Sequence, residues 1–282
     1  MVDIKEFAKQ DIYVVADIHG NFGAFLVNIK KFELKNCIII ICGDIGLGFY
    51  SREYYEEVFE TINNECIYRN IHLLMLRGNH DDPSYFFEYK IKFSNVETIN
   101  DYTIINVGDK HILCVGGAIS IDRSIRKHTY SSKISYALTQ LLYDNPNAKE
   151  EDAKKLVFPL YWEHEIPIYD EGLLNFINDL GFNIDYVVTH TSPSFAFKNT
   201  KNDIKYWLKK DKELSKDLDK ERKCMSLIYD FLVKNNNVIK KWVYGHFHDC
   251  NNEKINGTEF IALINADYSF KMCHLNYDET IF

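Results

Sequence analysis

Residue types that bind divalent metal ions follow apolar stretches at five widely separated places in this chain of 282 residues. Carboxylate, imidazole and amide oxygen together suit borderline divalent ions better than a set made only of thiolates. The first and last segments lie near opposite ends of the chain, so they can share a site only if one fold brings many strand ends to a common edge. The sequence therefore predicts an enzyme active site. The segments are Asp17-Ile18-His19-Gly20, Gly43-Asp44, Gly78-Asn79-His80-Asp81, Thr189-His190 and Gly245-His246-Phe247-His248.

The spacing within these segments is compatible with shared ligation. Asp17 and His19 are two residues apart where a strand is expected to end, and in extended chain residues i and i+2 point the same way. His246 and His248 repeat this spacing, and the two oxygens of Asp44 could bridge two ions. Taken singly, an Asp-x-His or a Gly-Asp is more often a turn or a helix cap. Together they indicate function, because half of the ten histidines lie at carboxyl ends of predicted strands, where open α/β sheets place their sites.

Apolar, β-branched runs of strand length supply the framework for these segments. They are continuous rather than alternating, which is typical of strands covered on both faces. Helix-compatible stretches, Phe22–Leu34 and Arg52–Arg69, separate the first three runs, and this alternation predicts βαβ units in a mainly parallel sheet. The fourth and fifth runs are a hairpin candidate through Gly108-Asp109. The runs are Ile12–Ala16, Cys37–Cys42, His72–Leu76, Tyr102–Val107, His111–Val115, Tyr186–Thr189, Lys241–Tyr244 and Phe260–Ile264.

Composition places the chain among ordinary globular proteins, with 46% hydrophobic and 26% charged residues. The net charge of -8 gives no general basic footprint for nucleic acid, which we expect only as a substrate. The seven cysteines include no CxxC pair, so reduced core thiols are expected at Cys37, Cys42 and Cys114. The start of the chain lacks an apolar signal core, and no apolar run is long enough to span a bilayer. These features predict a single domain over residues 1–282 of a soluble cytoplasmic protein without membrane association.

Two segments of that domain are predicted to be inserts, at about residues 121–170 and 198–237. The first carries Arg123 and Arg126, which we expect to lie over the metal cleft and to bind the substrate. The alternative is that both arginines form surface ion pairs with Asp122, Glu163 or Glu165. The second segment is dense in charge with a sparse apolar stripe, which is typical of a solvated amphipathic helix.

The motifs Asp-x-His, Gly-Asp, Gly-Asn-His-Asp, a lone strand-end His and Gly-His-x-His, in this order, resemble those of the calcineurin-like metallophosphoesterases. The resemblance covers Tyr13 to about His248. It implies an α/β fold, in which a two-layer mixed β sandwich is flanked by helices (αββα). It also implies a cofactor of two divalent metal ions, for which Mn²⁺ is the first expectation and Fe, Zn, Ni or Co are alternatives.

The resemblance also implies residue roles. One ion would be held by Asp17, His19, Asp44 and His248, and the other by Asp44 as a bridge together with Asn79, His190 and His246. His80 would be a catalytic acid rather than a ligand. Arg77 matches the position where phosphatase members of the family place an Arg on the phosphate.

The implied function is hydrolysis of a phosphate ester by a hydroxide that bridges the two ions, while His80 protonates the leaving oxygen. A nuclease or cyclic-nucleotide phosphodiesterase on the same centre is one alternative. A non-catalytic protein-binding scaffold is another alternative. Such a protein should lack some of the metal ligands or the catalytic His, whereas this sequence has a suitable residue at every one of these positions. One departure concerns serine/threonine phosphoprotein phosphatases, which continue the Gly-Asp motif with a second Asp and an Arg. Leu47 and Gly48 stand at those positions, which leaves the residue that orients His80 unidentified.

Overall fold

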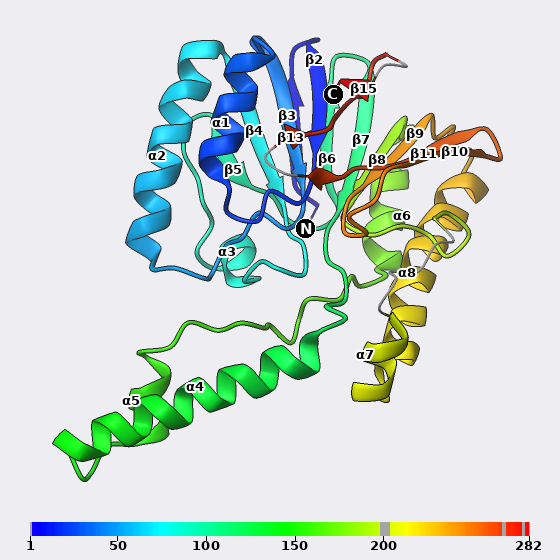
Figure 1. Ribbon diagram of the computed structural model, residues 1–282. Coiled ribbons are helices and arrows are strands. Elements are labelled where there is room, and N and C mark those ends of the chain that lie inside the picture. The colour runs from blue at the N-terminus through cyan, green and yellow to red at the C-terminus, as the bar shows by residue number, and fades with distance from the viewer. Residues whose placement is uncertain (1, 198–203, 267–268, 278–279, 282) are drawn as a thin grey trace.

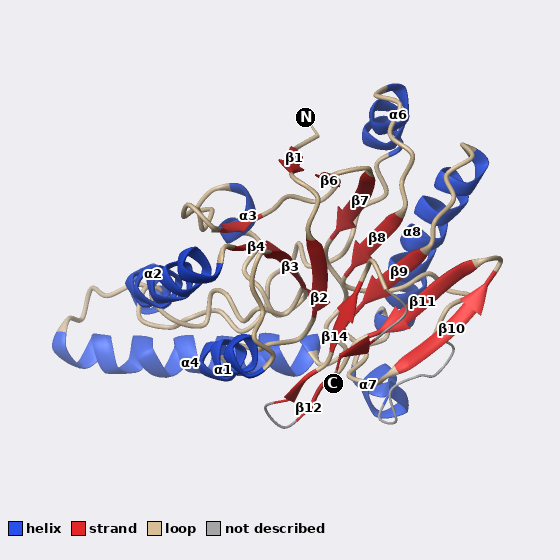
Figure 2. Cartoon of the chain, turned by 90° about the horizontal axis from the view of Figure 1, so that it is seen from above, coloured by secondary structure: helices blue, strands red, loops and turns tan. Residues whose placement is uncertain are grey.

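A computed structural model describes residues 2–197, 204–266, 269–277 and 280–281 of the chain. Two β-sheets pack face to face, and helices cover the outer face of each (Figures 1 and 2). This arrangement confirms the predicted two-layer sandwich flanked by helices. In the described ranges no helix combines the length and the apolar character needed to cross a membrane.

The first sheet carries the predicted βαβ units. Its order among the described residues is β15-β14-β2-β3-β4-β5, and β2 to β5 run parallel. Helices α1 and α2 connect β2 to β3 and β3 to β4, and both lie on its outer face (Figure 2). The elements are β2 (Asp11–Val15), α1 (Phe22–Lys31), β3 (Cys37–Cys42), α2 (Arg52–Arg69), β4 (Ile71–Leu76), α3 (Ser84–Phe87), β5 (Val96–Thr98), β14 (Met272–His274) and β15 (Thr280–Ile281).

The second sheet is mixed, with the order β1-β6-β7-β8-β9-β11-β10 among the described residues. Strands β6 and β7 form the predicted antiparallel hairpin, and β7, β8, β9 and β11 then run parallel. A short β12–β13 pair lies apart from both sheets. The elements are β1 (Ile4–Phe7), β6 (Thr103–Val107), β7 (Lys110–Val115), α6 (Glu171–Asp179), β8 (Tyr186–Thr189), β9 (Lys241–Tyr244), β10 (Asn251–Ile255), β11 (Thr258–Ala262), β12 (Asn265–Ala266) and β13 (Ser269–Phe270).

The continuous apolar runs arise because both faces of the strands are buried. In β3, Ile38 and Ile40 pack between the two sheets, while Ile39 and Ile41 pack beneath α1 and α2. A third cluster of apolar side chains lies between the second sheet and its helices. Six of the seven cysteines are buried and none forms a disulfide, as expected for reduced core thiols.

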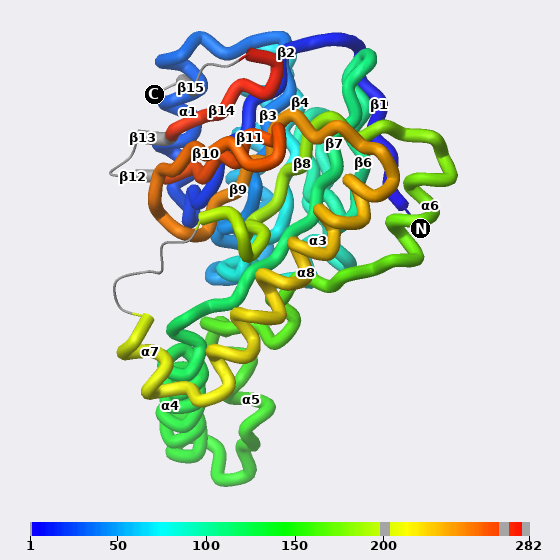
Figure 3. The backbone as a smooth tube through the Cα atoms, turned by 90° about the vertical axis from the view of Figure 1, so that its right-hand side faces the viewer, coloured from blue at the N-terminus to red at the C-terminus, as the bar shows by residue number. Residues whose placement is uncertain are grey.

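In their described residues, the predicted inserts contain the helices α4 (Arg123–Asp144), α5 (Glu150–Lys154), α7 (Ile204–Lys210) and α8 (Leu214–Lys234). Helices α4 and α5 form an arm that extends away from the sandwich (Figures 1 and 3). The charged second segment is not one solvated helix. The second half of α8 packs against the sheet through buried residues such as Met225, Ile228 and Leu232. These apolar residues recur every three or four positions, so they lie on one side of the helix, which faces the core.

Candidate metal centre

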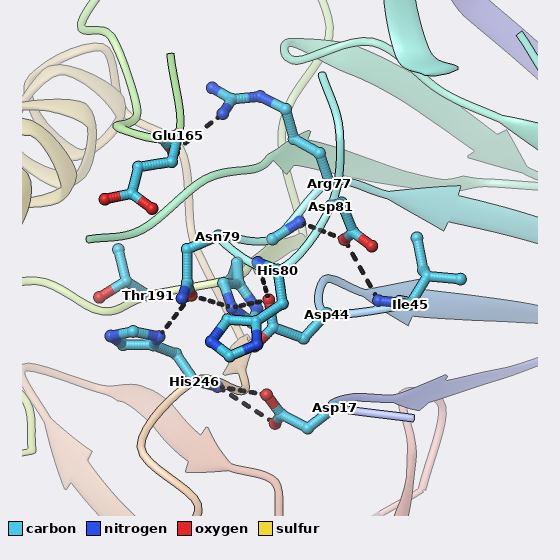
Figure 4. Close-up of polar contacts among 12 residues, drawn as sticks. Asp17, Asp44, Ile45, Arg77, Asn79, His80, Asp81, Glu165, Thr191 and His246 are labelled. Carbon is cyan, nitrogen blue, oxygen red and sulfur yellow. Dashed lines mark hydrogen bonds and ion pairs between the residues drawn. The ribbon is translucent and has the colours of Figure 1, made fainter. Parts of the chain in front are cut away.

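The seven predicted metal ligands come together at one end of the sandwich. Each follows the carboxyl end of one of five strands, β2, β3, β4, β8 and β9. Strand ends from both sheets contribute, so residues far apart in the sequence become neighbours. Figure 4 shows Asp17, Asp44, Asn79 and His246 directed toward a common centre, with the His80 ring beside it.

The first group of ligand atoms belongs to Asp17, His19, Asp44 and His248. Each residue contributes one potential ligand atom, and these four atoms lie within 4.8 Å of one another. The Nε2 atoms of His19 and His248 are 3.2 Å apart. Nε2 of His19 lies 3.8 Å from Oδ2 of Asp44, and Nε2 of His248 lies 3.7 Å from Oδ1 of Asp17. Two imidazoles and two carboxylates in this arrangement fit a divalent cation.

The second group converges on the amide oxygen of Asn79. Nε2 of His190 lies 3.0 Å from Oδ1 of Asn79, and Nδ1 of His246 lies 2.9 Å from it. Nε2 of His190 is also 3.1 Å from Oδ1 of Asp44. Asp44 therefore faces the second group with Oδ1 and the first group with Oδ2, which fits a carboxylate that bridges two ions.

Unusual backbone conformations concentrate in this centre. Five of the seven predicted ligands have positive φ angles, which residues other than glycine seldom adopt. Such residues persist only where the surrounding structure holds them, at a cost of about 1–3 kcal/mol each. Here backbone hydrogen bonds hold the turns, for example His19 N–H to the Asp44 carbonyl at 2.8 Å. The five residues are Asp17 (56°), His19 (46°), Asp44 (52°), His246 (69°) and His248 (51°).

The centre is shaped to hold positive charge. Burial acts to raise the pKa of Asp44, but His190, His80 and His19 outweigh it and hold that pKa well below its usual range. Burial likewise acts to lower the pKa of His190, while Asp44 and Asp17 raise it to about 9. Nδ1 of His190 lies 2.8 Å from the Cys42 carbonyl, so its N–H there would leave Nε2 to face the ligand groups.

Gly78 packs directly against the Asp44 carboxylate. A Cβ at this position would lie 2.2 Å from both the backbone nitrogen and Oδ1 of Asp44. We therefore expect Gly78→Ala to displace Asp44 at an overpacking cost of about 1–3 kcal/mol and to weaken metal binding at least tenfold. The measurement is Mn²⁺ affinity by calorimetry.

Gly23→Ala is the matched control, because a Cβ there meets nothing within 4 Å and the residue lies in α1. It should leave metal affinity unchanged and stabilise the helix by about 0.5–1 kcal/mol. Equal metal affinity in the two variants would contradict the packing argument.

A buried network that the sequence did not reveal orients Asn79. Its Nδ2 donates to Oγ of Ser120 at 3.0 Å, and Ser120 Oγ donates to Oε2 of Glu165 at 2.6 Å. Burial raises the pKa of Glu165 to about 8, although hydrogen bonds from Ser120 oppose the shift. Because the amide nitrogen is held on this side, the amide oxygen is presented to His190 and His246.

Asp81, the last residue of the Gly-Asn-His-Asp segment, holds two ligand loops together. Its buried carboxylate accepts backbone N–H groups from Ile45, Gly46, Leu47 and Gly78 at 2.7–3.2 Å. The loop after Asp44 and the turn before Asn79 are thus tied to one side chain. The sequence placed Asp81 within a motif but assigned it no role.

His80 lies beside the ligand groups without joining either. Its backbone N–H donates to Oδ1 of Asp44 at 2.8 Å, and its ring is edge-on to His19 with centroids 5.1 Å apart. Nη2 of Arg126 lies 3.3 and 3.2 Å from the two ring nitrogens. Burial and the Arg126 charge lower the pKa of His80 to about 4, although Asp44 opposes them.

Arg126 thus combines the two alternatives considered for it from the sequence. Its Nε donates to Asp122 at 2.7 Å and Nη1 donates to the Leu160 carbonyl at 3.2 Å, while Nη2 faces His80. The insert therefore brings one positive charge to the edge of the centre. It also supplies a side chain that, like His19, contacts the His80 ring.

The structure corrects the expected positions of two other arginines. The Arg77 guanidinium is 3% exposed and donates to Asp101 at 2.7 Å and to backbone carbonyls of residues 164–166, directed away from the ligands (Figure 4). Arg123 pairs with Asp211 at 2.6 Å and Asp217 at 2.9 Å, which ties α4 to α8. Neither is available for a substrate, because a buried guanidinium must satisfy its donors within the protein.

A family model described as calcineurin-like phosphoesterase matches residues 11–250 of the sequence. The chain belongs to the calcineurin-like phosphoesterase family. This assignment confirms the resemblance found in the motifs, and with the ligand groups above it supports a metal-dependent phosphoesterase. No curated protein matches the sequence significantly.

Solved structures similar to this calcineurin-like phosphoesterase are remote in sequence. A dimetal phosphatase from Danio rerio is 13% identical, with 94% of this chain and 92% of that chain covered and a TM-score of 0.47. A phosphopantetheinyl hydrolase from Mycobacterium tuberculosis is 11% identical, with coverages of 90% and 88% and a TM-score of 0.39. A serine/threonine phosphatase from Saccharomyces cerevisiae is 13% identical, with coverages of 93% and 71% and a TM-score of 0.38.

Proposed function

We propose that this protein hydrolyses a phosphate ester with the help of two divalent metal ions, Mn²⁺ being the first candidate and Fe, Zn, Ni or Co the alternatives. The observation that carries the proposal is the pair of ligand groups joined through the two oxygens of Asp44. When bound, two such ions supply charge stabilisation at the phosphoryl oxygens and an activated water as nucleophile. Asp17, His19 and His248 would hold one ion, and Asn79, His190 and His246 the other.

His80 is proposed to deliver the proton that the leaving oxygen needs. Its backbone N–H donates to Asp44, and its ring lies next to His19 and to the Arg126 guanidinium. Although its pKa is about 4 here, an anionic phosphoryl group beside the ring would favour the protonated form. General acid catalysis of this kind typically contributes about 10²–10⁴-fold in rate.

Arg126 is proposed to hold the anionic substrate, because its Nη2 is directed to the His80 ring. We expect Arg126→Ala to raise KM by roughly tenfold to a hundredfold, in line with the loss of a charged hydrogen bond worth about 1.5–3 kcal/mol, and to leave metal content unchanged. The measurement is steady-state kinetics with metal analysis.

Arg52→Ala is the control for this prediction, since Arg52 lies on α2, where it forms an exposed i,i+4 pair with Glu56 and lies over the Tyr89 ring. It should change neither KM nor metal content. An unchanged KM in Arg126→Ala would assign that arginine to the support of α4 alone.

The proposed function is tested by a substrate panel with Mn²⁺ that contains a phosphomonoester, a phosphodiester, a phosphoprotein and nucleic acid. We expect hydrolysis of at least one phosphate ester, abolished by a chelator and restored by metal. Cleavage confined to nucleic acid or a cyclic nucleotide would favour the alternative reactions on the same centre. Metal binding without hydrolysis of any substrate would favour the scaffold and overturn the proposal.

Residues 1–282 are proposed to form one domain with inserts at about 121–170 and 198–237. A cytoplasmic location without membrane association is proposed, because seven cysteines that form no disulfide suit a reducing compartment.

A further inference from the structure

An apolar cavity of about 280 Å³ lies beside the second ligand group. Its walls come from both predicted inserts and from the turn that carries two of the predicted ligands. Helix α7 contributes Ile204 and Leu208, and α8 contributes Leu218. Ile121, at the start of the first insert, and the Phe247 side chain complete the apolar lining.

The cavity borders the proposed metal centre at His246, a residue that belongs to both. This side chain lines the cavity, while its Nδ1 lies 2.9 Å from Oδ1 of Asn79 in the second ligand group. The neighbouring Phe247 ring is fixed, since it stacks on Phe197 with centroids 4.3 Å apart and lies 5.1 Å from the Arg222 guanidinium. A molecule held at the metal centre can therefore place its remaining part against a preformed apolar wall.

The buried polar groups in the cavity wall are largely engaged with the protein itself. The Glu221 carboxylate accepts hydrogen bonds from Oγ1 of Thr191 and the backbone N–H of Ile119. Nη2 of Arg222 donates to the carbonyls of Pro193 and Phe197, and its Nε has no hydrogen-bond partner among the described residues. Ser215 and the Asp219 carboxylate also line the cavity, and both residues are exposed. The wall thus suits a mainly apolar group and disfavours an anionic one.

We propose that this cavity binds the organic part of the substrate, which would make the substrate a phosphate ester of an aryl-containing or branched aliphatic alcohol. An apolar cavity of about 150 Å³ holds benzene, so a space of about 280 Å³ has room for one substituted ring. The inference rests on the proposed function, because the phosphoryl group is taken to lie at the metal centre. It deepens that function by naming the class of alcohol.

The kinetic test compares benzyl phosphate with ethyl phosphate in the presence of Mn²⁺. Both release an alkoxide leaving group, so the comparison isolates the organic group from leaving-group chemistry. We expect kcat/KM to be on the order of 10²-fold higher for benzyl phosphate, since a few carbons in an apolar pocket discriminate by this amount. Leu208→Trp, which fills the cavity, should lower the ratio of the two kcat/KM values, benzyl phosphate over ethyl phosphate, to about one.

Leu227→Trp is the matched control, because Leu227 is 37% exposed on α8 and does not line the cavity. It should preserve the preference for the benzyl ester. A loss of preference equal to that in Leu208→Trp would show that a general disturbance of the α7 and α8 helices causes the effect, and it would overturn the cavity assignment.

A binding measurement separates this inference from the proposed function. Benzylphosphonate and ethylphosphonate are not hydrolysed, and calorimetry with the Mn²⁺-loaded protein should show tighter binding of the benzyl compound by on the order of 10²-fold. Equal binding of the two phosphonates by the unmodified protein would overturn the cavity proposal, whether or not Leu208→Trp folds. Selective binding without hydrolysis of either ester would support the cavity and contradict the phosphoesterase function. Hydrolysis of both esters at equal kcat/KM would support the phosphoesterase function and contradict the cavity proposal.

Discussion

Asp44→Asn is expected to cause the largest loss of metal and of activity among single substitutions in this protein. Asp44 is the residue whose two oxygens face both ligand groups, at 3.1 Å from His190 and 3.8 Å from His19. The amide is of similar shape but neutral, so it weakens both proposed ion sites at once. Because each such ion supplies several kcal/mol to the transition state, kcat should fall by at least about 10³-fold. Metal analysis of the purified variant and steady-state kinetics are the measurements.

Asp109→Asn is the matched control, because Asp109 lies exposed in the β6–β7 turn and pairs with Lys110 at the surface. It should retain full metal content and activity. An Asp44→Asn protein that binds as much metal as this control and hydrolyses esters at a similar rate would contradict the bridging role.

His80→Ala is expected to lower kcat by about 10²–10⁴-fold while metal content stays intact. The reason is that His80 contacts Asp44 through its backbone N–H, while its ring lies outside both ligand groups. The loss should be much smaller for a nitrophenyl ester, whose leaving group needs little protonation, than for an alkyl ester. The measurement is kcat for both esters in both proteins.

His128→Ala serves as the control, since His128 is exposed on α4, and it should leave both rates unchanged. Equal losses in His80→Ala for good and poor leaving groups would assign His80 a positioning role. Loss of metal from this variant would instead make it a ligand.

The framework of the fold could be predicted because its signals are local. The bounds of α2 agree with the sequence prediction, since Ser51 caps its first turn and Asn70 ends it in the left-handed conformation. The central strands were recognisable because both of their faces are buried. Strands β1 and β10 were missed, because each alternates between exposed and half-buried residues at a sheet edge.

The centre was predictable only as far as its residues sit in short motifs. Seven ligand candidates stand at strand ends, and parallel strands bring such ends together. The Asn79–Ser120–Glu165 network joins three separate parts of the chain, so no local pattern revealed it. The error for Arg77 has a related cause, since the sequence shows a charge near the site but not the Asp101 that neutralises it.

The arm formed by α4 and α5 also depends on contacts between separate parts of the chain, which the local sequence does not reveal. The sequence indicated an insert without strands and placed two arginines over the cleft. In the structure Arg126 reaches His80, whereas Arg123, one turn earlier on the helix, joins Asp211 and Asp217 instead. Which of two neighbouring arginines faces the centre depends on how the whole helix is docked, and that is decided by contacts distant in sequence.

The central claim, a centre for two ions, is tested most directly by the stoichiometry of metal binding. Protein freed of metal by a chelator is titrated with Mn²⁺ by calorimetry, and bound metal is then measured by elemental analysis. Two ligand groups that share Asp44 predict saturation at two ions per chain. Saturation at a single ion per chain, with full activity, would contradict the two-metal account.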